Sequence, residues 1–179
     1  MASTAIVIPV LEAGASTGRW RGAYTEDGAN GMPPHVTLLY PFVDDGALDD
    51  RHVRAVAEIV GARPAFEFTL ARFGVFPGGD GAPAVLYIAP EPHAPFRELT
   101  DALVEAFPEH PPYDGAFSDV VPHLTVAWHD EAPVDEIRAE VARAFPIAAR
   151  ASEAWLMRFD GHWRAHARTP LCAYDSRMT

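Results

Sequence analysis

Residues 34–42, PHVTLLYPF, and residues 122–128, PHLTVAW, begin with the same pattern of proline, histidine, an apolar residue and threonine. Each copy opens a run of apolar, β-branched and aromatic residues that predicts a strand. A single His-x-Thr triplet means little, because threonine is common in strands. Two copies of the longer pattern, 88 residues apart, are far less probable by chance. The repeat therefore indicates two related halves that each contribute one such strand.

The spacing within each copy places its polar side chains on one face of the strand. Residues i and i+2 of a strand point the same way, so His35 projects with Thr37 and His123 projects with Thr125. The apolar residues between them face the other side. If the two strands occupy related halves of one sheet, two imidazoles and two hydroxyls line a single cleft.

Two imidazoles and two hydroxyls suit phosphodiester chemistry without a metal. A neutral histidine can take a proton from an attacking water or hydroxyl group, and a protonated one can give a proton to the departing oxygen. The ordinary histidine pKa of about 6.5 fits both roles. Threonine hydroxyls can donate hydrogen bonds to the non-bridging phosphate oxygens, where negative charge develops. The sequence leaves open which histidine is the acid and which is the base.

With these motifs the chain resembles the 2H phosphoesterase superfamily, which is named for two His-x-Thr/Ser motifs. The likeness is greater to its 2′-5′ RNA ligase-like branch, whose first motif often reads like the HVTLLYPF of residues 35–42. Apart from the tail, the resemblance covers nearly the whole chain. It implies a two-lobed, pseudo-symmetric α+β fold with mostly antiparallel sheets, helices on the outside and the two motifs facing each other across a central cleft.

The same resemblance implies metal-independent hydrolysis of cyclic phosphodiesters, typically 2′,3′-cyclic phosphates of RNA ends or small nucleotides opened to 2′-phosphates. By motif match, His35 and His123 are the catalytic pair, and Thr37 and Thr125 hold the phosphate. We expect no cofactor and no metal. Two alternatives stay open: a module that binds a nucleotide or RNA end without turnover, and a 2′-5′ RNA ligase, since ligation is a reverse or side activity in parts of the family.

Four further residues are candidates for substrate contact. Many relatives carry arginine or tyrosine five residues after the second motif's histidine, where this chain has Trp128, and Tyr40 holds the corresponding place in the first motif. Either ring could stack on a nucleobase, although strict alternation puts Trp128 opposite His123 unless a bulge or the strand's end turns it inward. Arg19 and Arg21 precede the first motif, and a flap there would bring positive charge to a phosphate.

Length and composition fit one domain over residues 1–179, made of two lobes. Hydrophobic residues make up 49% of the chain, enough to bury a core. No run approaches the roughly 18 apolar residues of a membrane span, and the N-terminus has no signal-peptide pattern. The single cysteine, Cys172, excludes an internal disulfide and a cysteine-based zinc cluster. We expect a cytoplasmic protein.

Charge narrows the range of partners. The chain has 14 basic residues, all arginine, against 25 acidic ones, so its net charge is −11. Nonspecific nucleic-acid affinity comes from neutralising phosphates, and we therefore expect no long nucleic acid as a partner. A few arginines can still hold one phosphate through bidentate contacts. The expected ligand is a small nucleotide or an RNA terminus with a cyclic phosphate, bound by a monomer without contact to a membrane.

Strands and helices alternate along the chain, which is typical of an α+β fold with a mostly antiparallel sheet. Strands are expected over residues 5–10, 35–42, 66–76, 84–89, 121–128, 148–159 and 162–171. Helices are expected over residues 49–61, 95–107 and 133–145. Residues 12–34, rich in glycine, serine and threonine, predict a loop with one helical turn around residues 19–24. Residues 172–179 are expected to be a frayed tail.

Overall fold

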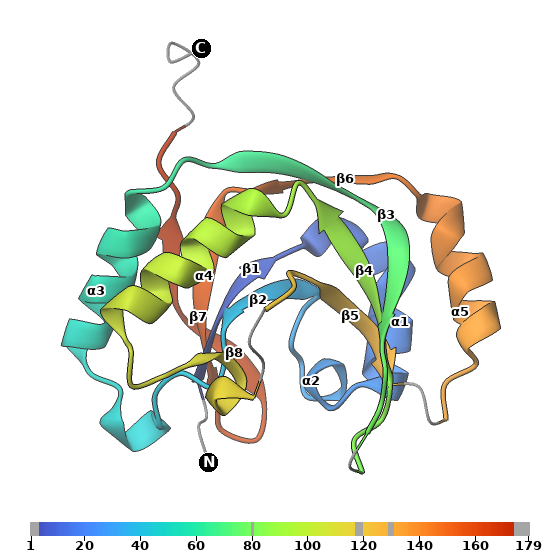
Figure 1. Cartoon of the computed structure of the whole chain (residues 1–179), viewed down its shortest axis with the longest axis horizontal. Helices are drawn as coiled ribbons and strands as arrows, with labels where there is room; N and C mark the ends of the chain where they lie inside the picture. The colour runs from blue at the N-terminus through green and yellow to red at the C-terminus, as the bar shows by residue number, and fades with distance from the viewer. Residues whose placement is uncertain (1–3, 80, 117–119, 129–130, 174–179) are drawn as a thin grey trace.

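Two four-stranded sheets form the centre of the protein, and helices cover them on the outside (Figure 1). The structure is a computed structural model that describes residues 4–79, 81–116, 120–128 and 131–173. Its strands are β1 (Thr4–Pro9), β2 (His35–Leu39), β3 (Phe66–Phe76), β4 (Val85–Glu91), β5 (Leu124–Trp128), β6 (Ile147–Ala151), β7 (Glu153–Phe159) and β8 (Trp163–Pro170). Its helices are α1 (Gly14–Tyr24), α2 (Glu26–Ala29), α3 (Asp50–Gly61), α4 (Ala94–Ala106) and α5 (Val134–Val141). Short 3₁₀ turns are η1 (Leu11–Ala13), η2 (Asp45–Ala47), η3 (Pro112–Gly115) and η4 (Ala142–Ala144).

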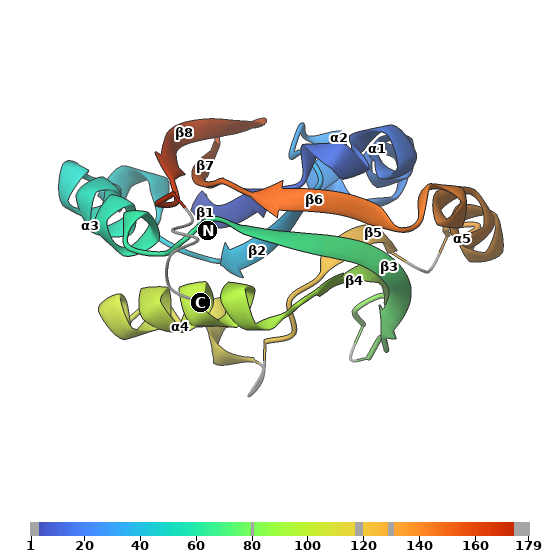
Figure 2. The same ribbon diagram turned by 90° about the horizontal axis from the view of Figure 1, so that it is seen from above.

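In both sheets an edge strand pairs with the strand that precedes it in the sequence. Their strand orders are β2-β1-β7-β8 and β5-β4-β3-β6, and every paired neighbour runs antiparallel. Each motif strand, β2 or β5, therefore lies at the edge of its own sheet, and the two edge strands contact each other. Figure 2 shows α3 and α4 at one end of this arrangement and α5 at the other. The expected pseudo-symmetric α+β fold with antiparallel sheets and outer helices is confirmed.

The predicted loop over residues 12–34 is wrong, because most of this stretch is helical. Helix α1 covers Gly14–Tyr24 and the short α2 follows at once. Glycines at positions 14, 18 and 22 are poor helix formers, and they hide the helical pattern in the sequence. Burial of Thr17, Trp20 and Arg21 stabilises α1 in the folded protein, which shows that tertiary packing overrides the weak local propensity.

The strand predicted over residues 148–159 is in fact two strands in different sheets. β6 pairs with β3, whereas β7 pairs with β1 and β8. The chain leaves one sheet and enters the other around the exposed Ser152. Both pieces have β-type composition, so the sequence carries no sign of the change. The other predicted strands and helices are present with ends that differ by a few residues, and most of the tail, residues 174–179, lies outside the described residues.

A continuous hydrophobic core joins the two sheets to the helices that cover them. Its main cluster includes Ile6 and Val36 from the first sheet, Leu70 and Leu124 from the second, and Leu99 from α4. Because both motif strands contribute their inward-facing residues to this cluster, the core fixes which face of each strand is left for the motif side chains. Within the described residues, no helix is long and apolar enough to cross a membrane.

The effect of a glycine within helix α1 on the stability of the protein can be tested by substitution. A Cβ added at Gly18 would meet no described atom within 4 Å, so alanine fits the folded state without strain. Replacing a mid-helix glycine by alanine restricts the unfolded chain and favours the helix by roughly 0.5–1 kcal/mol. We expect Gly18→Ala to raise the free energy of unfolding by about that amount in urea denaturation.

Gly31→Ala is the matched comparison. Gly31 has φ of +87°, and a Cβ there would overlap the His162 ring. We expect this variant to lower the free energy of unfolding by at least about 1 kcal/mol. Equal effects of the two alanines would contradict our description of this region.

Candidate functional site

A β-bulge follows the threonine of each motif at the same position. In β2, Thr37 and Leu39 pair with consecutive residues of β1, so Leu38 is the extra residue. In β5, Thr125 and Ala127 pair with consecutive residues of β4, so Val126 is the extra residue. A bulge inserts one residue and reverses the alternation beyond it. The two edge strands therefore share a local irregularity as well as a motif.

The bulges decide where the two candidate aromatic residues point. Leu38 and Leu39 in one strand, like Val126 and Ala127 in the other, are consecutive buried residues. The residues that follow them, Tyr40 and Trp128, are 36% and 38% exposed. The strict alternation that put Trp128 opposite His123 is thus interrupted, and both rings turn toward the face that carries the motif histidines and threonines.

The two motif histidines are held in the same way. Nδ1 of His35 lies 2.8 Å from the Pro33 carbonyl oxygen, and Nδ1 of His123 lies 2.7 Å from the Val121 carbonyl oxygen. A carbonyl oxygen only accepts, so Nδ1 carries the proton in both rings. In the neutral state each imidazole therefore keeps an unprotonated Nε2, which can accept a proton from a ligand.

A buried arginine stands beside the first histidine. Arg21, on α1, is 2% exposed, and its Nη1 donates a hydrogen bond to the Thr125 carbonyl oxygen of β5. Its Nε and Nη2 are buried and have no hydrogen-bond partner among the described residues. Burial lowers the pKa of Arg21 to about 10, against the opposite effect of the Asp27 carboxylate. The guanidinium therefore stays charged at neutral pH, with two donors to offer.

The charge of Arg21 lowers the pKa of His35, whereas no cation among the described residues is found to do so for His123. Burial, the Arg21 cation and the neighbouring His123 together lower the pKa of His35 to about 3, although its bond to the Pro33 carbonyl acts the other way. Burial also lowers the pKa of His123, which is partly exposed, and the bond to its own carbonyl partner opposes that shift. His35 is therefore the more firmly neutral of two imidazoles that lie close enough to influence each other.

Aromatic rings form one wall of the site around His123. The rings of Phe76 and Tyr87 stack at 4.2 Å, and each meets the His123 ring edge-on, at centroid distances of 4.9 and 5.6 Å. Tyr87 lies across from Gly74, where an added Cβ would overlap its ring. Glycine at position 74 thus leaves the space that lets Tyr87 reach His123. In the sequence these residues are ordinary strand positions, and no motif marks them.

Two further residues near the first motif were also missed. The Tyr113 hydroxyl is hydrogen-bonded to the Thr37 hydroxyl, and burial raises the pKa of Tyr113 to about 12. Burial also raises the pKa of Asp27, while Arg21 and a hydrogen bond from Trp163 act to lower it. Tyr113 comes from a proline-rich loop and Asp27 from α2, and no spacing in the sequence links either one to a motif.

Arg19 and Arg21 point to different places. The predicted flap around them is wrong, since both lie on helix α1. Arg19 forms an ion pair with Glu140 of α5 and lies over the Trp20 ring at 3.9 Å. It therefore faces away from the motif strands, and Arg21 is the member of the pair that stands beside the histidines.

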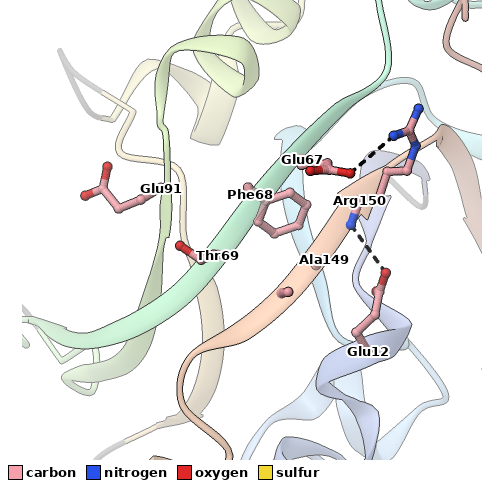
Figure 3. Close-up of a pocket in the computed structure, with 8 residues that line it drawn as sticks. Glu12, Glu67, Phe68, Thr69, Glu91, Ala149 and Arg150 are labelled. Carbon is pink, nitrogen blue, oxygen red and sulfur yellow. Dashed lines mark hydrogen bonds and ion pairs between the residues drawn. The ribbon is translucent and has the colours of Figure 1, made fainter. Parts of the chain in front are cut away.

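A separate hollow of about 430 Å³ lies on β3 and β6 (Figure 3). Glu67 pairs there with Arg150, whose backbone nitrogen donates to Glu12 at 3.3 Å. None of the motif residues lines this hollow. Among the described residues, no group of three or more histidine, cysteine, aspartate or glutamate side chains is arranged to hold a metal ion.

Comparisons with known proteins agree with this architecture. Residues 9–163 match the sequence model of the 2′-5′ RNA ligase superfamily. The fold is similar to that of TT0787 from Thermus thermophilus, with a TM-score of 0.65, 16% identity and coverage of 97% of this chain and 100% of that one. It is also similar to E. coli LigT complexed with 3′-AMP, with a TM-score of 0.58, 18% identity and coverage of 95% and 98%. Usb1 from Kluyveromyces marxianus gives a TM-score of 0.54, 14% identity and coverage of 95% and 98%. The comparison with curated proteins finds no significant match.

The buried state of His35 gives a prediction about stability and pH. Its pKa of about 3 in the folded protein lies below the ordinary value of 6.5, so the unfolded chain binds a proton more readily. The stabilisation is present above pH 6.5 and is lost as the pH falls toward 3. We expect the free energy of unfolding of the wild type to fall between about pH 7 and pH 4 by about 3 kcal/mol more than that of His35→Gln.

The control is His166→Gln, which removes an exposed histidine from β8. This variant keeps His35 and changes only an exposed side chain, so the pH dependence of its free energy of unfolding should follow that of the wild type. Urea titrations at several pH values measure all three proteins. Parallel curves for wild type and His35→Gln would show that His35 titrates normally.

Proposed function

Because the chain belongs to the 2′-5′ RNA ligase superfamily, we propose that it is a phosphodiesterase that opens the 2′,3′-cyclic phosphate of a small nucleotide or RNA end to a 2′-phosphate. Family membership supports an enzyme that acts on phosphodiester bonds. The observation that carries the finer proposal is the matched pair of histidines on contacting edge strands, each with Nδ1 hydrogen-bonded to a carbonyl and Nε2 left for the ligand.

In the proposed mechanism His35 is the general base and His123 is the general acid. Near pH 7 the imidazole of His35 is neutral, because burial and the Arg21 cation hold its pKa at about 3. Its Nε2 can therefore take a proton from water as the water oxygen bonds to phosphorus. Among the described residues no cation lowers the pKa of His123 in this way, and an entering phosphate anion raises it. Protonated His123 gives its Nε2 proton to the 3′-oxygen as the bond from phosphorus to that oxygen breaks.

The remaining candidates hold the substrate. Thr37 and Thr125 can donate their hydroxyl protons to the non-bridging oxygens. The charge of Arg21 stabilises the same anion, and its unpartnered Nε and Nη2 are donors that a phosphate would satisfy. Tyr40 and Trp128, which the bulges turn to this face, are suited to stacking on a base or sugar. Structures of E. coli LigT with 3′-AMP and with ATP support a nucleotide-sized ligand.

Product analysis tests the activity. We expect the wild type to convert nucleoside 2′,3′-cyclic phosphates, and a short RNA that ends in one, to 2′-phosphates in the presence of EDTA. His35→Ala and His123→Ala should each lower kcat/KM by at least about a hundredfold, the usual contribution of a general acid or base. The exposed His166→Ala should keep the wild-type rate. Chromatography with 2′- and 3′-phosphate standards identifies the product.

Other outcomes of this experiment distinguish the alternatives. Tight binding of the cyclic nucleotide without product would indicate a binding module. Joined products from RNAs with 2′,3′-cyclic phosphate and 5′-hydroxyl ends would indicate a ligase. Turnover that disappears with EDTA, or that survives the loss of either histidine, would refute the two-histidine mechanism.

A change of leaving group tests the assignment of acid and base. p-Nitrophenolate departs without a proton, so a nucleoside p-nitrophenyl phosphodiester does not need the general acid. We expect His123→Ala to lose less than about tenfold in kcat/KM on this substrate, while His35→Ala loses at least about a hundredfold. The release of p-nitrophenolate measures the rates of both variants. The reverse pattern would exchange the roles of the two histidines.

A further inference from the structure

A hollow beside the first motif opens where β2 ends. It has a volume of about 630 Å³, within the range of roughly 300–1,000 Å³ that small-molecule sites occupy. Its lining includes Tyr40, Asp44, Glu109, His110, Tyr113 and Asp114. It adjoins the candidate catalytic site directly, because the Tyr113 hydroxyl bonds to that of Thr37 and the Tyr113 backbone N–H donates to the Tyr40 carbonyl at 2.6 Å. A ligand with its phosphate at the motifs can extend into this hollow.

The wall of the hollow is a turn with an unusual backbone. Tyr113 and Asp114 both have left-handed backbone angles, with φ of 51° and 53°. Two successive non-glycine residues in this region are strained and persist only where neighbouring contacts hold them. The contacts of Tyr113 with Thr37 and Tyr40 provide that support. The turn brings the Asp114 carboxylate near the Tyr40 phenol, whose pKa is raised by burial first and then by Asp27, Glu26 and Asp114.

The charge of the hollow is opposite to that of the phosphate end of the site. Asp44, Glu109 and Asp114 contribute carboxylates to its lining, whereas the guanidinium of Arg21 stands beside the histidines. A second phosphate would be repelled from the hollow. A flat group with N–H donors would be attracted, since aromatic rings offer a stacking surface and carboxylates accept hydrogen bonds.

Among the nucleobases, guanine matches this lining best. It presents two adjacent donors, N1–H and the 2-amino group, which pair with the two oxygens of one carboxylate. Adenine and cytosine place a ring-nitrogen acceptor next to their amino group, and uracil flanks its single N–H with two carbonyl oxygens, so a carboxylate repels part of each. We propose that this hollow is a nucleobase subsite that selects guanine, with Asp114 as the residue that reads the base; this proposal rests on the proposed function.

Binding and turnover together test the subsite. We would measure the Kd of wild type for 2′-GMP and 2′-UMP by calorimetry, and kcat/KM for the 2′,3′-cyclic phosphates of guanosine and uridine. We expect the guanine ligand to be preferred about tenfold or more in both measurements, as for a bidentate base contact. Asp114→Asn keeps the size of the side chain and replaces one acceptor oxygen by a donor. It should remove most of the preference while the uridine values change less than about twofold.

The control variant is Asp101→Asn, an exposed position on α4 that does not line the hollow. It removes the same charge and should leave the preference unchanged. Equal Kd values for the two nucleotides in the wild type, or equal losses for both in Asp114→Asn, would overturn the subsite. A tenfold difference in Kd without any turnover would support the subsite and refute the proposed hydrolysis, so the two failures can be distinguished.

Discussion

The hydrogen bond from the Arg21 guanidinium to the Thr125 carbonyl links features that the chain separates by about a hundred residues. It ties helix α1 to the second motif strand, and it places a buried positive charge beside the histidine of the first. Burying a cation without full pairing costs free energy, and two of its donors have no partner among the described residues. This cost is understandable if the charge serves a ligand, because an anion between the histidines would satisfy those donors.

The pseudo-symmetry of the fold gives the two motif histidines the same backbone setting, although the side chains around them differ. Both motif strands are sheet edges with a bulge after the threonine, and both histidines hydrogen-bond to a carbonyl two residues earlier. What differs is what the rest of the chain packs against them. His35 is buried beside a cation, whereas His123 is partly exposed and bordered by Phe76 and Tyr87. Repetition thus supplies two like groups, and the asymmetric packing around them supports the different roles proposed for them.

The parts of the structure that depend on local periodicity could be predicted from the sequence, and the parts that depend on distant contacts could not. The i, i+2 spacing of each motif and the apolar stripes of α3 and α4 are local, and the elements that contain them are present. Leu38 and Val126 are ordinary strand residues, so nothing marks them as bulges. The glycines of α1 hide a helix that packing stabilises, and Tyr113 reaches Thr37 from a loop whose sequence shows only prolines and a turn.

The net charge of the chain says little about ligand binding at the candidate site, because the electric field there is set by the charged groups nearby. The chain carries −11 overall, which argues against binding along a polyphosphate backbone. One buried arginine nevertheless gives the surroundings of His35 a local positive charge, as the proposed binding of a single phosphate requires, since low-dielectric surroundings strengthen its field. The carboxylates around Tyr113 act in the opposite sense a short distance away. A ligand with one phosphate and one neutral ring rich in N–H donors fits both the positive charge of Arg21 and the carboxylates around Tyr113, but only in one orientation. In that orientation the phosphorus would lie near the two imidazoles.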